Sequence, residues 1–136
     1  MCRNEASKRV KFVPKGWGFE KIIVNNTLYC GKLLYVIKDM RGSIHYHKIK
    51  NESFYVHSGH VEVRYYDDRE ALEAFLNQNG PNKVYDLMEK IILGPGDVFP
   101  VPVGRVHQLI GLQDSEVFEF STEDFSDDSY RLIKGD

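Results

Sequence analysis

Four side chains with the chemistry of metal ligands stand out in the sequence. His45 and His47 are separated by one residue, so on a β-strand both imidazoles project from the same face. Glu52 follows a short connection, where a hairpin would bring its carboxylate back beside the two rings, and His107 opens a later strand-like run. Three imidazoles and one carboxylate form a borderline ligand set. This set suits one divalent Zn, Mn, Fe, Co or Ni ion and leaves open positions for water or substrate.

Each of these residues has a plainer interpretation when it is taken alone. A His-x-His pair on a strand is commonly a coincidence, an isolated Glu52 would be a solvated carboxylate, and His107 would be a polar residue at a strand start. The combination, in this order, predicts the metal site. His57 and His60 flank a turn at Ser58-Gly59 and are expected to face solvent.

The spacing resembles the two sequence signatures of the cupin superfamily. The stretch Gly42-x2-His45-x-His47-x4-Glu52-x6-Gly59 matches the first signature, and Gly96-x5-Pro102-x-Gly104-x2-His107 matches the second. A departure occurs at Gly111, where the second signature often has Asn, a position that is not a metal ligand in cupins. The resemblance implies an all-β fold, the cupin double-stranded β-helix or jelly-roll barrel, with His45, His47, Glu52 and His107 around the metal.

A closer resemblance, running through most of the chain, is to the phosphomannose-isomerase type of cupin domain. Residues 16–20 resemble that family's initial Pro-Trp-Gly-x-Tyr-Glu, the spacing from Lys32 to Gly59 matches without a gap, and residues 127–132 resemble its Asp-Asp-Ile-Val-Arg-Leu. The family usually has Gln where this chain has His45, which leaves the metal and the reaction open. The match therefore indicates a cupin of sugar metabolism more strongly than it indicates mannose 6-phosphate.

The resemblance implies metal-dependent isomerisation of an aldose to a ketose through a metal-stabilised enediolate. Glu119 matches the glutamate of the family's Ile-Glu-Val segment and is the candidate base that moves the proton. Lys32 lies at a strand lysine of the family and is the candidate partner of Glu119 or an oxyanion donor. Surface positions are the plainer interpretation of both residues.

Further side chains are candidates for substrate binding. If the substrate is phosphorylated, the cations expected to ring the mouth of the barrel are Lys50, Arg105 and Arg131. An arginine would grip phosphate as a bidentate fork and a lysine as a point charge. Tyr55 could stack on a sugar face, as could Tyr46 and Trp17, although packing is the commoner fate of such residues.

Two other functions fit the same ligand set. An Fe(II)-dependent cupin dioxygenase acting on a small organic substrate could use three imidazoles with or without the carboxylate. A non-catalytic sugar-binding cupin would keep the barrel without turnover. Solvent deuterium in the sugar product would favour isomerisation, whereas oxygen consumption with Fe(II) would favour the dioxygenase.

The elements that must position these residues are mostly strands. Strand-like runs separated by Gly, Pro, Asn and Asp occupy residues 19–26, 32–38, 43–49, 53–57, 61–66, 84–93, 97–102, 106–112 and 115–121. Residues 67–80 instead place apolar side chains at helical spacing, with Asp67 or Asp68 as a cap and Gly80 at the end. We expect one short helix packed on the outside of the barrel, with a lid over its mouth as the alternative.

Length and composition limit the number of domains, the kinds of partner and the compartment that we expect. The chain has 136 residues, the size of one domain, and we expect a flexible basic arm over residues 1–15 and a single cupin domain over residues 16–136. A formal net charge of -2 gives no reason to expect nucleic acid or an anionic membrane as partner. No signal peptide or apolar span is evident, so we expect cytoplasmic residence, and Cys2 and Cys30 are expected to be free thiols.

The same patterns give expectations for the interior and for assembly. The interior positions near the metal are expected to be Ile49, Phe54, Val56 and Leu109. The resemblance implies a homodimer that takes a small-molecule sugar or sugar phosphate as its ligand. The strand around residues 22–24 is the candidate for pairing across the dimer interface.

Overall fold

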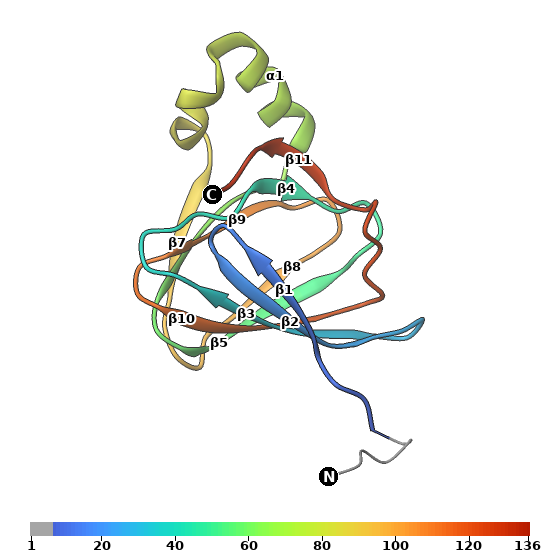
Figure 1. Cartoon of the computed structure of the whole chain (residues 1–136). Helices are drawn as coiled ribbons and strands as arrows, with labels where there is room; N and C mark the ends of the chain where they lie inside the picture. Colours follow the sequence, from blue (N-terminus) through green and yellow to red (C-terminus); the bar gives the residue numbers. More distant parts are fainter. Residues whose placement is uncertain (1–6) are drawn as a thin grey trace.

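Two antiparallel sheets enclose a common interior in the computed structural model, which describes residues 7–136 (Figure 1). The six-stranded sheet has the order β1-β2-β3-β10-β5-β8, and the five-stranded sheet has the order β11-β4-β9-β6-β7. The strands of the first sheet are β1 (Lys11–Lys15), β2 (Gly18–Asn25), β3 (Cys30–Val36), β10 (Ser115–Ser121), β5 (Glu52–Ser58) and β8 (Val98–Val101). Those of the second are β11 (Tyr130–Ile133), β4 (Ile44–Tyr46), β9 (Val106–Gly111), β6 (Val61–Tyr66) and β7 (Glu89–Leu93). In the described part of the chain, no helix has the length and apolar character needed to cross a membrane.

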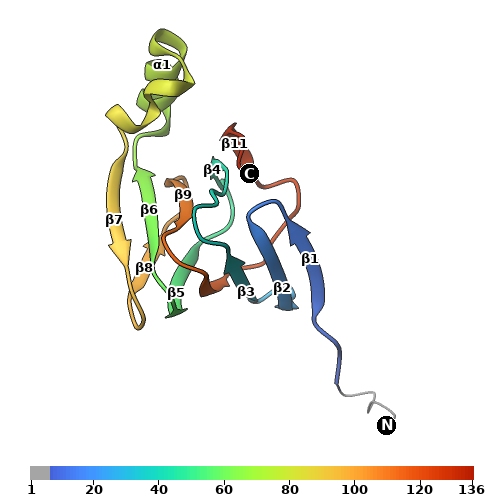
Figure 2. The same cartoon turned by 60° about the vertical axis from the view of Figure 1, so that its left-hand side comes forward.

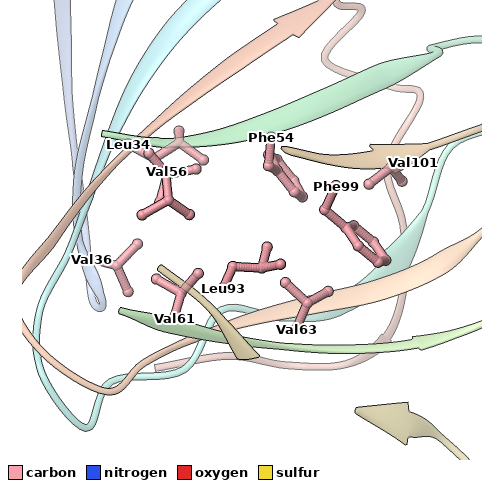
Figure 3. Close-up of a cluster of buried hydrophobic side chains, with 10 residues drawn as sticks. Leu34, Val36, Phe54, Val56, Val61, Val63, Leu93, Phe99 and Val101 are labelled. Atoms are coloured by element: carbon pink, nitrogen blue, oxygen red, sulfur yellow. The ribbon is translucent and has the colours of Figure 1, made fainter. Parts of the chain in front are cut away.

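Alternation along the strands builds the hydrophobic core. On β5, Phe54 and Val56 are buried, and their neighbours Ser53 and Tyr55 lie on the other face. Ten buried side chains from both sheets pack together between the sheets (Figure 3). The core therefore fills one part of the interior, and the polar residues described below lie in the other part.

A second hydrophobic cluster attaches the helix to the outside of the five-stranded sheet. The helix α1 (Arg69–Asn79) begins at Asp68, whose carboxylate accepts a hydrogen bond from the Ala71 N–H at 3.0 Å. Its fully buried Leu72 packs in a cluster with Ile44 of β4 and Val106 of β9. Figure 2 shows the helix beyond the ends of β6 and β7. The predicted helix is confirmed.

The predicted strand over residues 84–93 is wrong in its first half. A 3-10 helix, η1 (Pro81–Asp86), precedes β7, which begins only at Glu89. Pro81 favours the first turn of a helix, and Val84 and Met88 are buried against the α1 cluster rather than alternating across a sheet. The apolar content of the segment therefore reflects packing under the helix.

The N-terminal segment also differs from the expectation. Residues 1–6 of the expected arm lie outside the described residues, but Lys11–Lys15 form β1, which pairs with β2 from Lys11 opposite Ile22 to Lys15 opposite Gly18. The expected flexible arm is therefore wrong for residues 11–15. Because β1 already occupies this edge of β2, Ile22 is not free to pair across a dimer interface.

Asp128 connects the C-terminal segment to the turn that follows β4. Its fully buried carboxylate accepts hydrogen bonds from the backbone N–H groups of Lys48, Ile49 and Lys50, at 2.9, 3.1 and 2.9 Å. This turn explains one error: Ile49 was expected in the interior, but it is 61% exposed because it lies in the turn and not on a strand. Phe54 and Val56 are buried as predicted, and Leu109 is partly buried against the core.

Replacing Asp128 with Ala should destabilise the protein. Three backbone N–H groups would lose their acceptor, so we expect a loss of about 3 kcal/mol in the free energy of unfolding, measured by urea denaturation. The adjacent Asp127 is exposed, and the Asp127→Ala control should change stability by less than about 0.5 kcal/mol. Equal stability of the two variants would contradict this role of Asp128.

Candidate functional site

Three imidazoles converge between β4 and β9. His45 lies on β4, His47 directly follows it, and His107 lies on β9 opposite His45 in the strand register. The ring centroids are 4.4 Å apart for His45 and His107, 5.0 Å for His45 and His47, and 5.5 Å for His47 and His107. One nitrogen of each ring lies within 4.8 Å of those of the other two. This three-histidine cluster can hold a divalent metal ion.

A carbonyl oxygen fixes the orientation of each ring. The Nδ1 atoms of His47 and His107 lie 2.6 and 2.9 Å from the backbone oxygens of Asp128 and Arg105. His45 Nδ1 lies 2.9 Å from the Ser43 hydroxyl and 3.2 Å from the Ser43 backbone oxygen. Because a carbonyl only accepts, Nδ1 of His47 and of His107 carries the proton and donates it, which leaves the lone pair on Nε2. These two rings are therefore held in the tautomer whose Nε2 can bind a metal.

Glu52 completes the group from the start of β5. Its Oε1 lies 3.1 Å from His107 Nε2, and its Oε2 lies 3.6 Å from His47 Nε2. Burial alone would raise the pKa of Glu52, but the close contact with His107 and the ammonium group of Lys50 hold it below its ordinary value. Glu52 is therefore an ionised carboxylate beside two ring nitrogens.

The arrangement of these four residues fits a bound cation. His47 Nε2, His107 Nε2 and Glu52 Oε1 are buried without a hydrogen bond to the described residues, whereas Glu52 Oε2 lies 2.9 Å from the ammonium group of Lys50. Burial lowers the pKa of His47 and, more strongly, of His45, so these rings stay neutral near pH 7. The Nε2 lone pairs and Glu52 Oε1 repel one another where they meet, and a divalent ion between them would supply the missing positive charge.

The ammonium group of Lys50 lies at the centre of a buried ion-pair network. It lies 2.9 Å from Glu52 Oε2, 3.1 Å from Glu119 Oε2 and 3.0 Å from Asp124 Oδ1. Burial alone would lower the pKa of Lys50, but these three carboxylates raise it. Lys50 therefore lies inside the barrel and not at its mouth, where it was expected, and it lines the cavity described below, so its role as a substrate ligand stays a prediction.

The network continues to Glu119 and Lys32, the residues predicted for catalysis. Glu119 of β10 lies opposite Lys32 of β3 in the register, and both side chains are buried. Burial, and then the charge of Glu52, raise the pKa of Glu119 to about 7. The ammonium group of Lys32 lies 3.0 Å from Asp124 Oδ2 and 3.9 Å from Glu20 Oε1.

These residues line a cavity of about 390 Å³ at the polar end of the interior. Its polar wall contains the three imidazoles, Glu52, Glu119 and Lys32, and its apolar wall contains Trp17, Leu34, Val36 and Leu109. Arg131 lines the cavity as predicted for a substrate ligand, together with Lys11 and Lys15 of β1. No residue of α1 contributes to the lining, and the alternative of a helical lid stays a prediction.

Two of the predicted substrate ligands lie elsewhere. Arg105 donates to both carboxylate oxygens of Asp67, at 2.7 and 3.2 Å, and to the Pro100 carbonyl, and does not line the cavity. Tyr55 projects from the outer face of β5, because it alternates with the buried Phe54 and Val56. Neither side chain contacts the cavity, so both predictions are wrong on position.

Three acidic residues of the site were not identified from the sequence. Glu20 and Asp128 lie inside the segments that resemble the phosphomannose-isomerase type, and that resemblance was the signal that could have found them. Asp124 lies in an irregular segment between β10 and β11, with no motif around it. Only the folded chain brings Asp124 to Lys32 and Lys50.

Comparison with known proteins supports the fold. No family model matches the sequence, and no curated protein shows a significant match. Among solved structures, KdgF from Halomonas sp. is similar, with a TM-score of 0.60 and 23% identity over 80% of this chain and 81% of that one. The capsular polysaccharide assembling protein CapF from Staphylococcus aureus gives a TM-score of 0.71 and 18% identity over 93% of this chain and 35% of CapF.

Oxalate decarboxylase from Bacillus subtilis, whose structure was studied for its Mn(II) centres, gives a TM-score of 0.67 and 17% identity over 90% of this chain and 30% of that one. The chain thus spans about a third of CapF and of oxalate decarboxylase, and most of KdgF. None of the three similarities indicates the phosphomannose-isomerase type in particular. Together with the two antiparallel sheets, they show that the chain has the cupin fold.

Proposed function

We propose that the chain is a metal-dependent enzyme that interconverts an aldose and a ketose, with a sugar or sugar phosphate as its substrate. One observation carries the proposal: the carboxylate of Glu119, whose pKa is raised to about 7, lines the same cavity as the three-histidine cluster. A group with such a pKa takes up and returns a proton readily near neutral pH. Isomerisation by proton transfer needs a proton to be removed and returned, and such a group can do both.

The metal would be held by His45, His47 and His107, with Glu52 as the fourth ligand. The local charge beside Glu52 supports this assignment, since the single ammonium group of Lys50 faces the three carboxylates of Glu52, Glu119 and Asp124. A divalent ion at Glu52 would offset part of this excess negative charge. When bound, the ion would supply Lewis-acid stabilisation of negative charge on the sugar oxygens.

Glu119 would perform the proton transfer. As a carboxylate, it would remove the proton from the hydroxyl-bearing carbon next to the carbonyl, and the electron pair of that C–H bond would form the double bond of an enediol. Glu119 would then return the proton to the neighbouring carbon, while a proton moves between the two oxygens. Burial raises the pKa of Glu119 and the positive charges of Lys50 and Lys32 lower it, so these lysines would keep the carboxylate ionised for the first step.

Different residues of the cavity wall would bind the charged and the apolar parts of the substrate. Arg131, Lys11 and Lys15 line the cavity, and none of them forms an ion pair within residues 7–136, so they are available to an anionic group. Trp17 offers an apolar surface for the carbon face of a sugar. The structural similarity to CapF, a capsular polysaccharide assembling protein, supports a carbohydrate ligand, and the similarity to a protein with Mn(II) centres supports the metal.

Replacing His47 with Ala should remove the metal. The loss of one of three imidazoles should weaken the binding of Mn(II), Co(II) or Zn(II) by at least about 100-fold, as measured by titration calorimetry and by metal analysis of the purified protein. The control His57→Ala changes an exposed histidine outside the cluster and should bind metal like the wild type. Unchanged metal binding in His47→Ala would contradict the assignment.

Replacing Glu119 with Gln should preserve metal binding and abolish isomerisation. We expect kcat on a panel of aldoses and aldose phosphates to fall by roughly 100- to 10,000-fold, because the amide cannot accept the proton. Transfer of deuterium from solvent to C2 of the sugar should fall in parallel. Glu116→Gln, on the outward face of the same strand, is the matched control and should keep full activity.

Three outcomes would overturn the proposal. A fully active Glu119→Gln variant would remove Glu119 as the base. Oxygen consumption by the Fe(II)-loaded protein with no isomerisation would identify a dioxygenase. A ligand-induced thermal shift with no product in either assay would identify a sugar-binding protein.

The titration of Glu119 should also appear in the stability of the metal-free protein. Its pKa is raised from 4.5 to about 7, so the folded state holds this proton more tightly than the unfolded state does, and its contribution to stability falls as pH rises through that interval. Relative to the wild type, Glu119→Gln should therefore gain stability from pH 4.5 to 7, and the difference should level off above pH 7. Denaturant unfolding across this range measures the difference, and a constant difference would contradict the raised pKa.

A further inference from the structure

Asp124 lies in the irregular segment between β10 and β11 and lines the cavity. Its backbone is fixed by Asn25 at the end of β2. The side-chain N–H of Asn25 donates to the Asp124 carbonyl at 2.9 Å, and the side-chain oxygen of Asn25 accepts from the Asp124 N–H at 2.9 Å. Because both contacts use the backbone of Asp124, they hold this point of the segment against the six-stranded sheet and leave the carboxylate free to bind other groups.

The carboxylate of Asp124 lies between two buried ammonium groups. Its Oδ1 lies 3.0 Å from Lys50 Nζ, and its Oδ2 lies 3.0 Å from Lys32 Nζ, so each oxygen accepts from one lysine. Lys50 has two further carboxylates at 2.9 and 3.1 Å. In the described part of the chain, the other carboxylate that pairs with Lys32 is that of Glu20, 3.9 Å away. Asp124 is therefore the main partner of Lys32.

Lys32 lies near Glu119 without a bond between them. The two residues are opposite one another in the pairing of β3 with β10, and both are buried. Glu119 Oε2 accepts from Lys50 at 3.1 Å, whereas Glu119 Oε1 has no hydrogen-bond partner among residues 7–136. No ion pair joins Lys32 to Glu119 over the same residues. The charge of Lys32 therefore acts on Glu119 from a distance, and Oε1 remains available.

Without the carboxylate of Asp124, this arrangement would change. A buried ammonium group without a partner is strongly unfavourable, and the long side chain of Lys32 can turn to a new acceptor. The acceptor opposite it on the neighbouring strand is Glu119. Lys32 and Lys50 would then bind one oxygen each of Glu119, and a carboxylate that accepts hydrogen bonds from two ammonium groups is a weak base.

We propose that Asp124 is a positioning residue, which holds the ammonium group of Lys32 away from Glu119 and so keeps Oε1 of Glu119 free to accept the substrate proton. The role of Oε1 rests on the proposed function, in which Glu119 is the base, whereas the position of Lys32 does not depend on it. Lys32 acts on Glu119 by its charge and not by a hydrogen bond, and the segment between β10 and β11 sets the distance between them.

A crystal structure of Asp124→Ala tests the position of Lys32 without an enzyme assay. Because Asn25 binds the backbone at this position, the segment should stay in place, and Lys32 Nζ should move to about 3 Å from Glu119 Oε1. The control, Asp127→Ala, changes an exposed carboxylate of the same segment and should leave Lys32 where it is. A Lys32 that keeps its position in Asp124→Ala, or turns to solvent and not to Glu119, would overturn the proposal.

Kinetics on the panel of aldoses and aldose phosphates test the consequence for the base. Asp124→Ala should lower kcat by roughly 10- to 100-fold and change KM by less than about threefold, because the base is affected more than the binding of substrate. The double variant Lys32→Met/Asp124→Ala removes one positive and one negative charge together and frees Oε1 again. Its kcat should exceed that of Asp124→Ala by at least about tenfold, and a double variant as inactive as Asp124→Ala would count against the proposal.

Failure of this role and failure of the proposed function give different results. If the wild type isomerises no sugar, the proposed function fails, and the crystal structures still decide whether Asp124 controls the position of Lys32. Thermal unfolding reports whether each variant folds. If Asp124→Ala does not fold, the charge-balanced double variant decides: its kcat should be at least about ten times that of Glu119→Gln, and equal kcat values would contradict the proposal.

Discussion

The buried ammonium group of Lys50 connects the parts of the molecule that form the cavity. It links Glu52 of β5, Glu119 of β10 and Asp124 of the C-terminal segment at distances of about 3 Å. A buried charge is tolerated only when it is paired, so the four groups depend on one another. Asp128 adds a second constraint, because it fixes the backbone of Lys50 with its side chain and the ring of His47 with its carbonyl. The three-histidine cluster and the charged network are therefore held by the same short turn.

One end of the interior is an apolar core that stabilises the fold, and the other end holds the residues of the candidate site. Core side chains such as Val56 and Val117 are fully buried and join the two sheets through apolar packing. The other end of the interior buries carboxylates and imidazoles that, without a cation, face one another with too little positive charge. Such an arrangement opposes folding on its own, and the core offsets it. A bound divalent ion would relieve this repulsion and stabilise the folded state.

Sequence patterns predicted the features that depend on local periodicity. The strands from β2 to β6, the helix with its Asp68 cap, and the convergence of His45, His47 and His107 follow from alternation, capping and motif spacing. The errors occur at residues whose position and partners are determined by tertiary packing. Lys50 is buried only because two carboxylates from distant segments, Glu119 and Asp124, join Glu52 around it, and Arg105 is held by Asp67, which belongs to the turn before the helix. Such partners are distant in sequence, and no local pattern reports them.

The metal is the central element of this account, and crystallographic anomalous scattering tests it most directly. Crystals grown with Mn(II) should show one strong anomalous peak per chain, surrounded by His45, His47, His107 and Glu52, with the Lys50–Glu119 pair intact beside it. An anomalous map with no peak at this centre, in protein exposed to excess metal, would contradict the account.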